Sequence, residues 1–146
     1  MDQPLVTIEL QDGASPPEYQ SSGAAGADLR AHLCSPCILE PGSRAMLPTG
    51  LRICLPPGYE AQVRSRSGLA AKHGVACLNA PGTIDSDYRG EIQVILHNHG
   101  DAPYVVNNGD RIAQLVIAPV CRACFKQSLV PMDSDRGSAG FGSTGR

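Results

Sequence analysis

A chain of 146 residues can bury one hydrophobic core and has the length of one ordinary domain. Gly (16) and Pro (12) are abundant and aromatic residues amount to 4%, which indicates many turns and few long helices. The net charge of −2 excludes a protein that binds nucleic acid through a bulk positive field, and no apolar run approaches the ~18 residues of a membrane span. We therefore expect a cytoplasmic protein with no nucleic-acid partner and no membrane partner.

Short strands separated by turns are predicted along most of the chain. Apolar and polar residues alternate in several segments, as expected for half-buried strands, and Pro-Gly or Asn-Gly pairs separate them. Many short strands with regular turns are typical of an all-β sandwich, jelly roll or barrel. The predicted strands are residues 5–10, 44–55 with a break at 48–50, 59–63, 91–97 and 111–117.

One short helix is predicted between residues 67 and 74. Ser67 is expected to cap its start and Gly74 to end it. Lys72 and His73 fall near its C-terminus, where the helix dipole favours positive charge. That position accounts for His73 without a catalytic role.

Six cysteines in a cytoplasmic chain are expected to be reduced. The pairs Cys34/Cys37 and Cys121/Cys124 have the C-x-x-C spacing of structural zinc sites. The second pair falls in a strand-like stretch, where an offset of three places two thiols on opposite faces. We therefore interpret the cysteines, including Cys54 and Cys77, as buried or half-buried apolar residues, with a zinc-stabilised structural protein as a weaker alternative.

The last fourteen residues have a different composition from the rest. Residues 133–146 are polar and glycine-rich, which is typical of a flexible segment, and they include one aromatic residue and two arginines. We therefore predict a β domain over residues 1–132 and a flexible C-terminal segment over residues 133–146.

Two segments carry side chains suited to chemistry. Residues 64–70 join a strand to the helix, and their arginines, hydroxyls and backbone N–H groups could bind an anion that Gly68 lets approach closely. Residues 82–90 form a carboxylate-bearing hairpin, in which Asp85 and Asp87 could act as a base or contact a metal. Each segment by itself also fits an ordinary capped helix and an ordinary tight turn.

Five segments taken together resemble the ordered motifs of the trimeric dUTPase family. Their order and spacing both match, and the resemblance runs from about residue 4 to the end of the chain. The segments are AGADLR (25–30), RSGLA (66–70), NAPGTIDSDYRGE (79–91), GDRIAQL (109–115) and RGSAGFGSTG (136–145). The resemblance implies a jelly-roll-like β fold, a homotrimer with active sites between subunits, and Mg²⁺-assisted hydrolysis of dUTP to dUMP and pyrophosphate.

The resemblance also implies a role for individual residues at the phosphates. Asp85 would be the general base that deprotonates the attacking water. Mg²⁺ on the triphosphate would offset negative charge together with two arginines, and Asp28 would contact that ion through water. The residues expected to bind phosphate oxygens are Arg66, Ser67, Gly68, Gln114, Arg136, Gly142 and Ser143.

Base and sugar selection would come from the hairpin and the tail. Asn79 and the backbone around Thr83 and Ile84 would pair with the uracil edge, and Tyr88 would leave no room for a 2′-hydroxyl. Phe141 would stack on uracil as the tail closes as a lid. The family usually has Gly at the position of Ala139, where Ala costs about 1–2 kcal/mol if the backbone needs a positive φ.

Two further alternatives stay open from the sequence. One is a dCTP deaminase or its bifunctional version, which shares the fold but needs a glutamate at the cytosine. Glu91 is expected to be a solvent-facing strand residue rather than such a base. The other is a catalytically silent binding module of the same fold, which turnover of dUTP would exclude.

Overall fold

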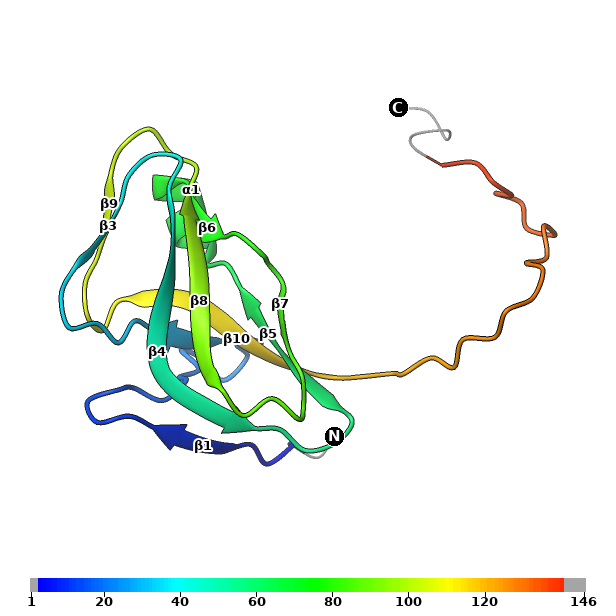
Figure 1. Ribbon diagram of the computed structural model, residues 1–146, viewed down its shortest axis with the longest axis horizontal. Coiled ribbons are helices and arrows are strands. Elements are labelled where there is room, and N and C mark those ends of the chain that lie inside the picture. The colour runs from blue at the N-terminus through cyan, green and yellow to red at the C-terminus, as the bar shows by residue number, and fades with distance from the viewer. Residues whose placement is uncertain (1–2, 141–146) are drawn as a thin grey trace.

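The computed structural model describes residues 3–140 and consists mostly of short strands with one short helix (Figure 1). One four-stranded sheet has the order β1-β4-β8-β6, a second has the order β2-β10-β5-β7, and β3 pairs with β9. The strands are β1 Thr7–Leu10, β2 Ala27–Arg30, β3 Cys37–Leu39, β4 Arg44–Cys54, β5 Tyr59–Arg64, β6 Val75–Cys77, β7 Gly82–Ile84, β8 Glu91–Asn98, β9 Tyr104–Val106 and β10 Arg111–Pro119, and the helix is α1 Ser67–His73.

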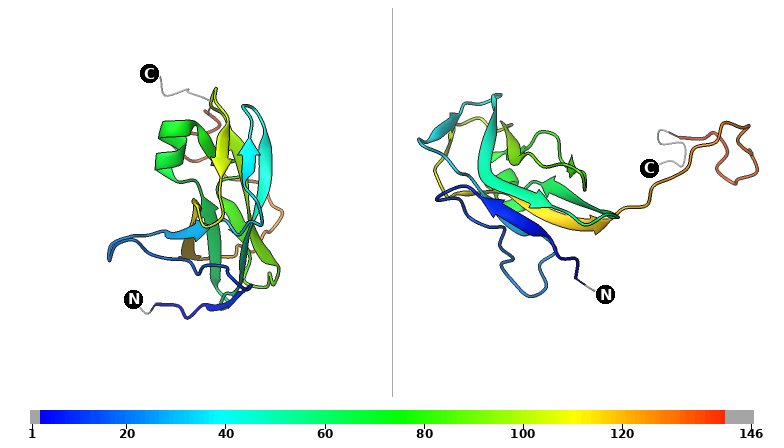
Figure 2. Two further views of the ribbon diagram at one scale, coloured as in Figure 1. Left: turned by 90° about the vertical axis from the view of Figure 1, so that its left-hand side faces the viewer. Right: turned by 60° about the horizontal axis from the view of Figure 1, so that its bottom comes forward.

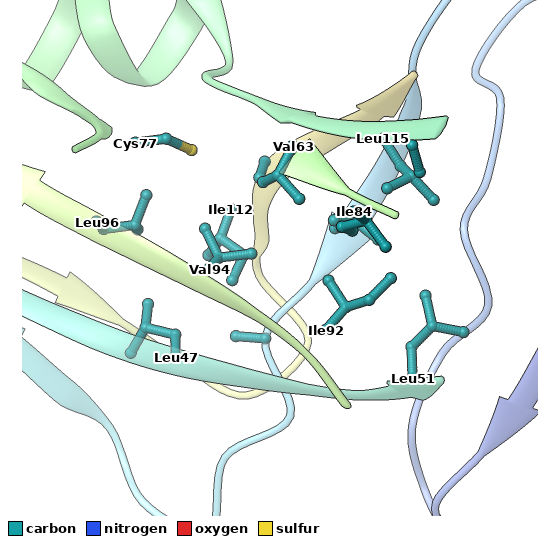
Figure 3. Close-up of a cluster of buried hydrophobic side chains, with 14 of the residues drawn as sticks. Leu47, Leu51, Val63, Cys77, Ile84, Ile92, Val94, Leu96, Ile112 and Leu115 are labelled. Atoms are coloured by element: carbon teal, nitrogen blue, oxygen red, sulfur yellow. The ribbon is translucent and has the colours of Figure 1, made fainter. Parts of the chain in front are cut away.

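One apolar core lies between the two four-stranded sheets. Leu47, Val94 and Leu96 enter it from β4 and β8, and Val63 and Leu115 enter it from β5 and β10 (Figure 3). In β8 the buried residues alternate with more exposed ones, as the sequence pattern predicted. Aliphatic side chains therefore fill the core of a chain with few aromatic residues.

The predicted break in the strand over residues 44–55 is a bulge inside one continuous strand, β4. Pro48 pairs with Gln93 and Arg52 pairs with Glu91, so four steps along β4 match two steps along β8. Gly50 lies in the bulge with φ +66°, a conformation that glycine adopts without strain. The glycine was a correct sign of irregular backbone, but the sheet continues past it.

Helix α1 ends as predicted and begins differently. Gly74 has φ +67° and donates from its N–H to the Ala70 carbonyl, which confirms it as the C-terminal cap. The residue at the N-cap is Arg66, whose backbone is extended, and no side chain caps the helix there. The prediction that Ser67 is the cap was therefore wrong, because Ser67 is the first residue of the helix itself.

The cysteines divide into two groups. Cys77 is buried and Cys37 is half-buried, as predicted, and burial raises the pKa of the Cys77 thiol while a hydrogen bond with Ser65 lowers it. Cys34, Cys54, Cys121 and Cys124 are exposed, so their interpretation as buried or half-buried residues was wrong. Cys121 and Cys124 lie beyond β10, which ends at Pro119, so they belong to no strand.

After β10 the chain leaves the body and extends away from it (Figures 1 and 2). The Val120 N–H donates to the Gly58 carbonyl at the point of departure. Residues 120–139 are exposed, including Phe125 (94%) and Leu129 (96%). The departure comes before residue 133, where composition placed the predicted boundary, since residues 120–132 are still partly apolar in sequence. Among residues 3–140, no helix is long and apolar enough to cross a membrane.

Candidate active site

A pocket of about 250 Å³ opens beside the loop that joins β7 to β8. The prediction of a hairpin here was wrong, because β7 pairs with β5 and β8 pairs with β4 and β6, so this β7–β8 loop connects the two sheets. Five of the residues predicted to handle base, sugar and water line the pocket together: Asn79, Thr83, Ile84, Asp85 and Tyr88. They come from the turn after β6, from β7 and from the turn that follows it. The segment over residues 79–88 therefore forms one concave surface.

The pairing of β7 with β5 holds the strand that enters the β7–β8 loop. Thr83 lies opposite Gln62 and Ile84 opposite Ala61, and the Ile84 side chain is buried in the core. Thr83 on the opposite face and Asp85 beyond the strand are exposed. The buried Ile84 side chain thus anchors the end of β7, and the Asp85 carboxylate that follows it is accessible to a ligand.

The turn after β7 and the start of β8 fix the ring of Tyr88. The Tyr88 N–H donates to the Asp85 carbonyl at 3.1 Å, and the Tyr88 hydroxyl donates to the Glu91 carbonyl at 2.9 Å. A side chain on Gly90 would overlap the Tyr88 ring, so glycine is needed at that position. The ring is 45% exposed and forms one wall of the pocket.

A second cluster surrounds Asp28 on the sheet that contains β2 and β10. Asp28 is 2% exposed, and its two carboxylate oxygens lie 3.4 Å from Arg66 Nε and 3.1 Å from Arg111 Nη1. Arg66 also donates from Nη1 to the Arg111 carbonyl at 2.9 Å. Gln114 lies opposite Asp28 across the β2–β10 pair. Asp28 therefore fixes Arg66 next to Gln114.

Ser67 and Gly68 follow Arg66 at the start of α1, and both are exposed. A Cβ built on Gly68 would have no atom within 4 Å, so the backbone there faces open space. Burial raises the pKa of the Tyr104 phenol, the charge of Asp110 raises it further and Arg66 lowers it. Ser67 and Gly68 are therefore accessible to a ligand directly after Arg66 in the chain.

The two clusters remain separate within one chain. Of the described residues that line the pocket, none is Arg66, Ser67, Gly68 or Gln114. Arg136 lies on the extended segment, where its Nε donates to the Ala139 carbonyl at 2.9 Å. Phe141, Gly142 and Ser143 lie outside the described residues. One chain therefore provides the parts of the predicted site in three places.

Sequence reasoning missed several residues of the two clusters. Met46 and Gln93 line the pocket from β4 and β8, where no local motif distinguishes them. Arg111 stands within a recognised segment but was not assigned a role. The prediction that Glu91 faces solvent was wrong, because its side chain is half-buried and accepts a hydrogen bond from the Gly50 N–H at 2.8 Å.

The ion pairs of Asp28 lead to a stability prediction. Asp28→Asn removes the charge that two arginines share, and we expect the free energy of unfolding to fall by about 2–3 kcal/mol. The loss stays below that of a fully buried pair because the arginine side chains remain 23% and 40% exposed. Urea unfolding at one protein concentration measures it.

The matched control is Glu18→Gln, which removes the exposed pair between Glu18 and Arg30 at 3.6 Å. That change should cost less than about 1 kcal/mol. Equal unfolding midpoints for the two variants would show that the Asp28 pairs contribute no more than a surface contact.

Comparison with known proteins identifies the family of the chain. The family model described as dUTPase matches residues 12–145. Proteins named deoxyuridine 5′-triphosphate nucleotidohydrolase from Roseobacter denitrificans and from Chlamydia pneumoniae are each 55% identical to it, over 97% and 96% of this chain and 97% of each relative.

A solved structure agrees with this assignment. A variant of the dUTPase of Staphylococcus bacteriophage 80alpha with dUpNHpp superimposes with a TM-score of 0.87, at 26% identity over 97% of this chain and 99% of that one. The sequence match and the structural match both extend over nearly the whole chain. The chain belongs to the dUTPase family.

Proposed function

We propose that the protein hydrolyses dUTP to dUMP and pyrophosphate, which removes dUTP as a source of uracil in DNA and supplies dUMP for thymidylate synthesis. The observation that carries the proposal is the pocket in which Asp85 and Tyr88 meet Asn79 and Thr83. The name shared by the two relatives at 55% identity supports the same substrate.

In the proposed reaction Asp85 takes a proton from water as the water oxygen attacks the α-phosphorus. The bond between that phosphorus and the bridging oxygen to the β-phosphate breaks, and pyrophosphate leaves. The exposed Asp85 carboxylate at the edge of the pocket is accessible to such a water. Arg66 and Arg136 would stabilise charge on the phosphate oxygens, with Ser67, Gly68 and Gln114 as donors.

Mg²⁺ fits this site as an ion bound mainly by the triphosphate and water, since it retains several waters and needs few protein ligands. Bound there, it would neutralise charge on the triphosphate. Asp28 is the protein residue that would contact its hydration shell, next to the arginines that already occupy its carboxylate. A structure of the phage phi11 dUTPase describes a structural Mg(II) ion in that protein.

Selection of uracil and deoxyribose is assigned to the segment from Asn79 to Tyr88. Asn79 and the backbone at Thr83 and Ile84 would pair with the base, and the Tyr88 ring would exclude a 2′-hydroxyl by contact. The ring is suited to steric exclusion because Gly90 and the Glu91 carbonyl hold it in place. Rejection by a fixed wall is stronger than the loss of one favourable contact.

Tyr88→Ala should therefore admit UTP. Without the ring the 2′-hydroxyl has space, and we expect the preference for dUTP over UTP in kcat/KM to fall roughly 100-fold. Tyr88→Phe keeps the ring but loses the hydrogen bond to the Glu91 carbonyl, so the preference should fall only about tenfold. Parallel assays of pyrophosphate release with the two nucleotides measure both variants, and an unchanged preference in Tyr88→Ala would remove the steric argument.

Self-association into a homotrimer of jelly-roll-like subunits is proposed for two reasons. The base pocket and the Arg66 cluster are separate within one chain, so a complete site needs residues from another copy. Residues 120–132 also extend from the body with exposed apolar side chains, among them Phe125 and Val130, which a second copy would cover.

The C-terminal residues 133–146 are proposed to close over the bound nucleotide. Arg136, Gly142 and Ser143 would reach the β- and γ-phosphates and Phe141 would cover the uracil. Such a lid excludes water other than the nucleophile and completes the site. The separation of residues 120–139 from the body supports a segment that acts on a site elsewhere.

The test of the proposed function is a parallel assay with Mg²⁺ and dUTP, dCTP, dTTP or UTP. Pyrophosphate release from dUTP alone supports the proposal. Ammonia release from dCTP would instead support a deaminase, and binding of dUTP without turnover would support a silent binding module.

A further inference from the structure

The bulge in β4 brings buried backbone groups next to the first residues of β8. Gly50 is buried in this bulge, and its φ of +66° turns its N–H away from the regular ladder. A Cβ at Gly50 would lie 2.5 Å from Ala14 Cβ and 3.0 Å from His32 Cδ2, so glycine is required there. The bulge is therefore a specified feature that needs partners for its polar groups.

Two side chains provide those partners. Thr49 Oγ1 donates to the Ile92 carbonyl at 2.6 Å and accepts from the Leu51 N–H at 3.2 Å. The Glu91 carboxylate accepts from the Gly50 N–H at 2.8 Å. Glu91 and Thr49 thus join the bulge to the start of β8 by side-chain hydrogen bonds in the gap of the strand register.

Glu91 also contacts Tyr88 in the β7–β8 loop. Its backbone carbonyl accepts the hydrogen bond from the Tyr88 hydroxyl at 2.9 Å, and the residue lines the pocket. One residue therefore holds the β4 bulge through its carboxylate and the Tyr88 ring through its carbonyl. A shift of Glu91 would move the ring relative to Thr83 and Ile84, which line the pocket from β7 in the other sheet.

We propose that Glu91 is a positioning residue that fixes the Tyr88 ring by its bond to Gly50, and so sets the discrimination between deoxyribose and ribose. This inference rests on the proposed hydrolysis of dUTP for its substrate but not for its contact. Glu91 exchanges no proton with the substrate. It acts through Tyr88.

The first test follows the hydrogen bond itself, independently of activity. Amide hydrogen exchange at Gly50 in the full-length protein should speed up at least about tenfold in Glu91→Ala, because the N–H loses its acceptor. Glu91→Gln keeps a side-chain oxygen and should retain the protection. Unchanged protection in Glu91→Ala would overturn the proposed contact, whatever the protein does with dUTP.

The second test connects the contact to specificity. Glu91→Ala should lower the preference for dUTP over UTP in kcat/KM about tenfold, and Glu91→Gln should keep it within about twofold. Glu9→Ala is the matched control. Glu9 is exposed on β1 of the same sheet, and its carboxylate forms an ion pair with Arg52 at 3.5 Å. A preference unchanged in Glu91→Ala overturns the positioning role even if the variant melts earlier.

Thr49→Val separates positioning from direct contact with the nucleotide. Thr49 does not line the pocket, yet it holds the same bulge against Ile92. If the bulge positions the ring, Thr49→Val also lowers the preference for dUTP over UTP. If only Glu91→Ala lowers it, Glu91 acts on the nucleotide directly and the proposal is wrong.

Discussion

Asp85→Asn is expected to lower kcat for dUTP by about 10²–10⁴-fold while leaving nucleotide affinity nearly unchanged. The amide keeps the size of the side chain but cannot accept the proton of the attacking water. Because Asp85 is exposed at the pocket edge, the substitution should not disturb the fold. Pyrophosphate release measures turnover, and calorimetric titration with dUpNHpp measures affinity.

The β7–β8 loop offers a matched control for this substitution in Asp87→Asn. Asp87 is exposed on the same turn, two residues along the chain, and does not line the pocket. Its variant should keep kcat within about twofold. Near-normal turnover in Asp85→Asn would show that the base is another group, and an equal loss in both variants would point to the charge of the turn rather than to proton transfer.

Removal of residues 136–146 is expected to lower kcat/KM for dUTP by about 10²–10³-fold. The deletion removes the arginine proposed to stabilise the phosphates and the aromatic residue proposed to cover the base. Folding and assembly should persist, because residues 136–139 are exposed and outside the core. Turnover assays, thermal melting and light scattering of the truncated protein measure these three effects.

Single substitutions distinguish the arginine from the length of the tail. Arg136→Ala should reproduce most of the loss, whereas Arg122→Ala, an exposed arginine on the same extended segment, should not. Full activity in the truncated protein would remove the lid from the mechanism. A smaller assembly after truncation would mean instead that these residues hold the subunits together.

Local patterns predicted the elements whose structure depends on neighbours in sequence. Alternation placed β5 and β8, because every second side chain of a strand faces the core. Gly74 ended α1 as predicted because its left-handed backbone needs no distant partner. The start of α1 was misplaced by one residue, since the extended backbone of Arg66 defines it and no side chain does.

Features that depend on distant partners were beyond the sequence patterns. The Glu91 side chain turns inward to meet Gly50, which is 41 positions away, and the Arg111 side chain meets Asp28 across 83 positions. Nothing near Glu91 in the chain indicates a bulge on the opposite strand. The apolar stretch after Pro119 likewise has the composition of a strand, but strand formation needs a partner edge.

The division of the site within one chain could be predicted only in outline. The resemblance implied active sites between subunits, but residues 66–70 and 79–91 are close along the chain and no residue pattern showed which of them meet. β5 and β7 pair antiparallel in one sheet, so Arg66 beyond the end of β5 and Asp85 beyond the end of β7 lie at opposite ends of the pair. The residue types could therefore be predicted, but not which of them meet within one subunit.

The central claim is that water activated by Asp85 attacks the α-phosphorus of dUTP, and isotope labelling tests it most directly. A single turnover with Mg²⁺ in H₂¹⁸O, followed by mass spectrometry of both products, locates the new oxygen. We predict one ¹⁸O atom in dUMP and none in pyrophosphate, with no label incorporated on the same timescale by Asp85→Asn. Label in pyrophosphate, or release of dUDP and inorganic phosphate, would contradict the account.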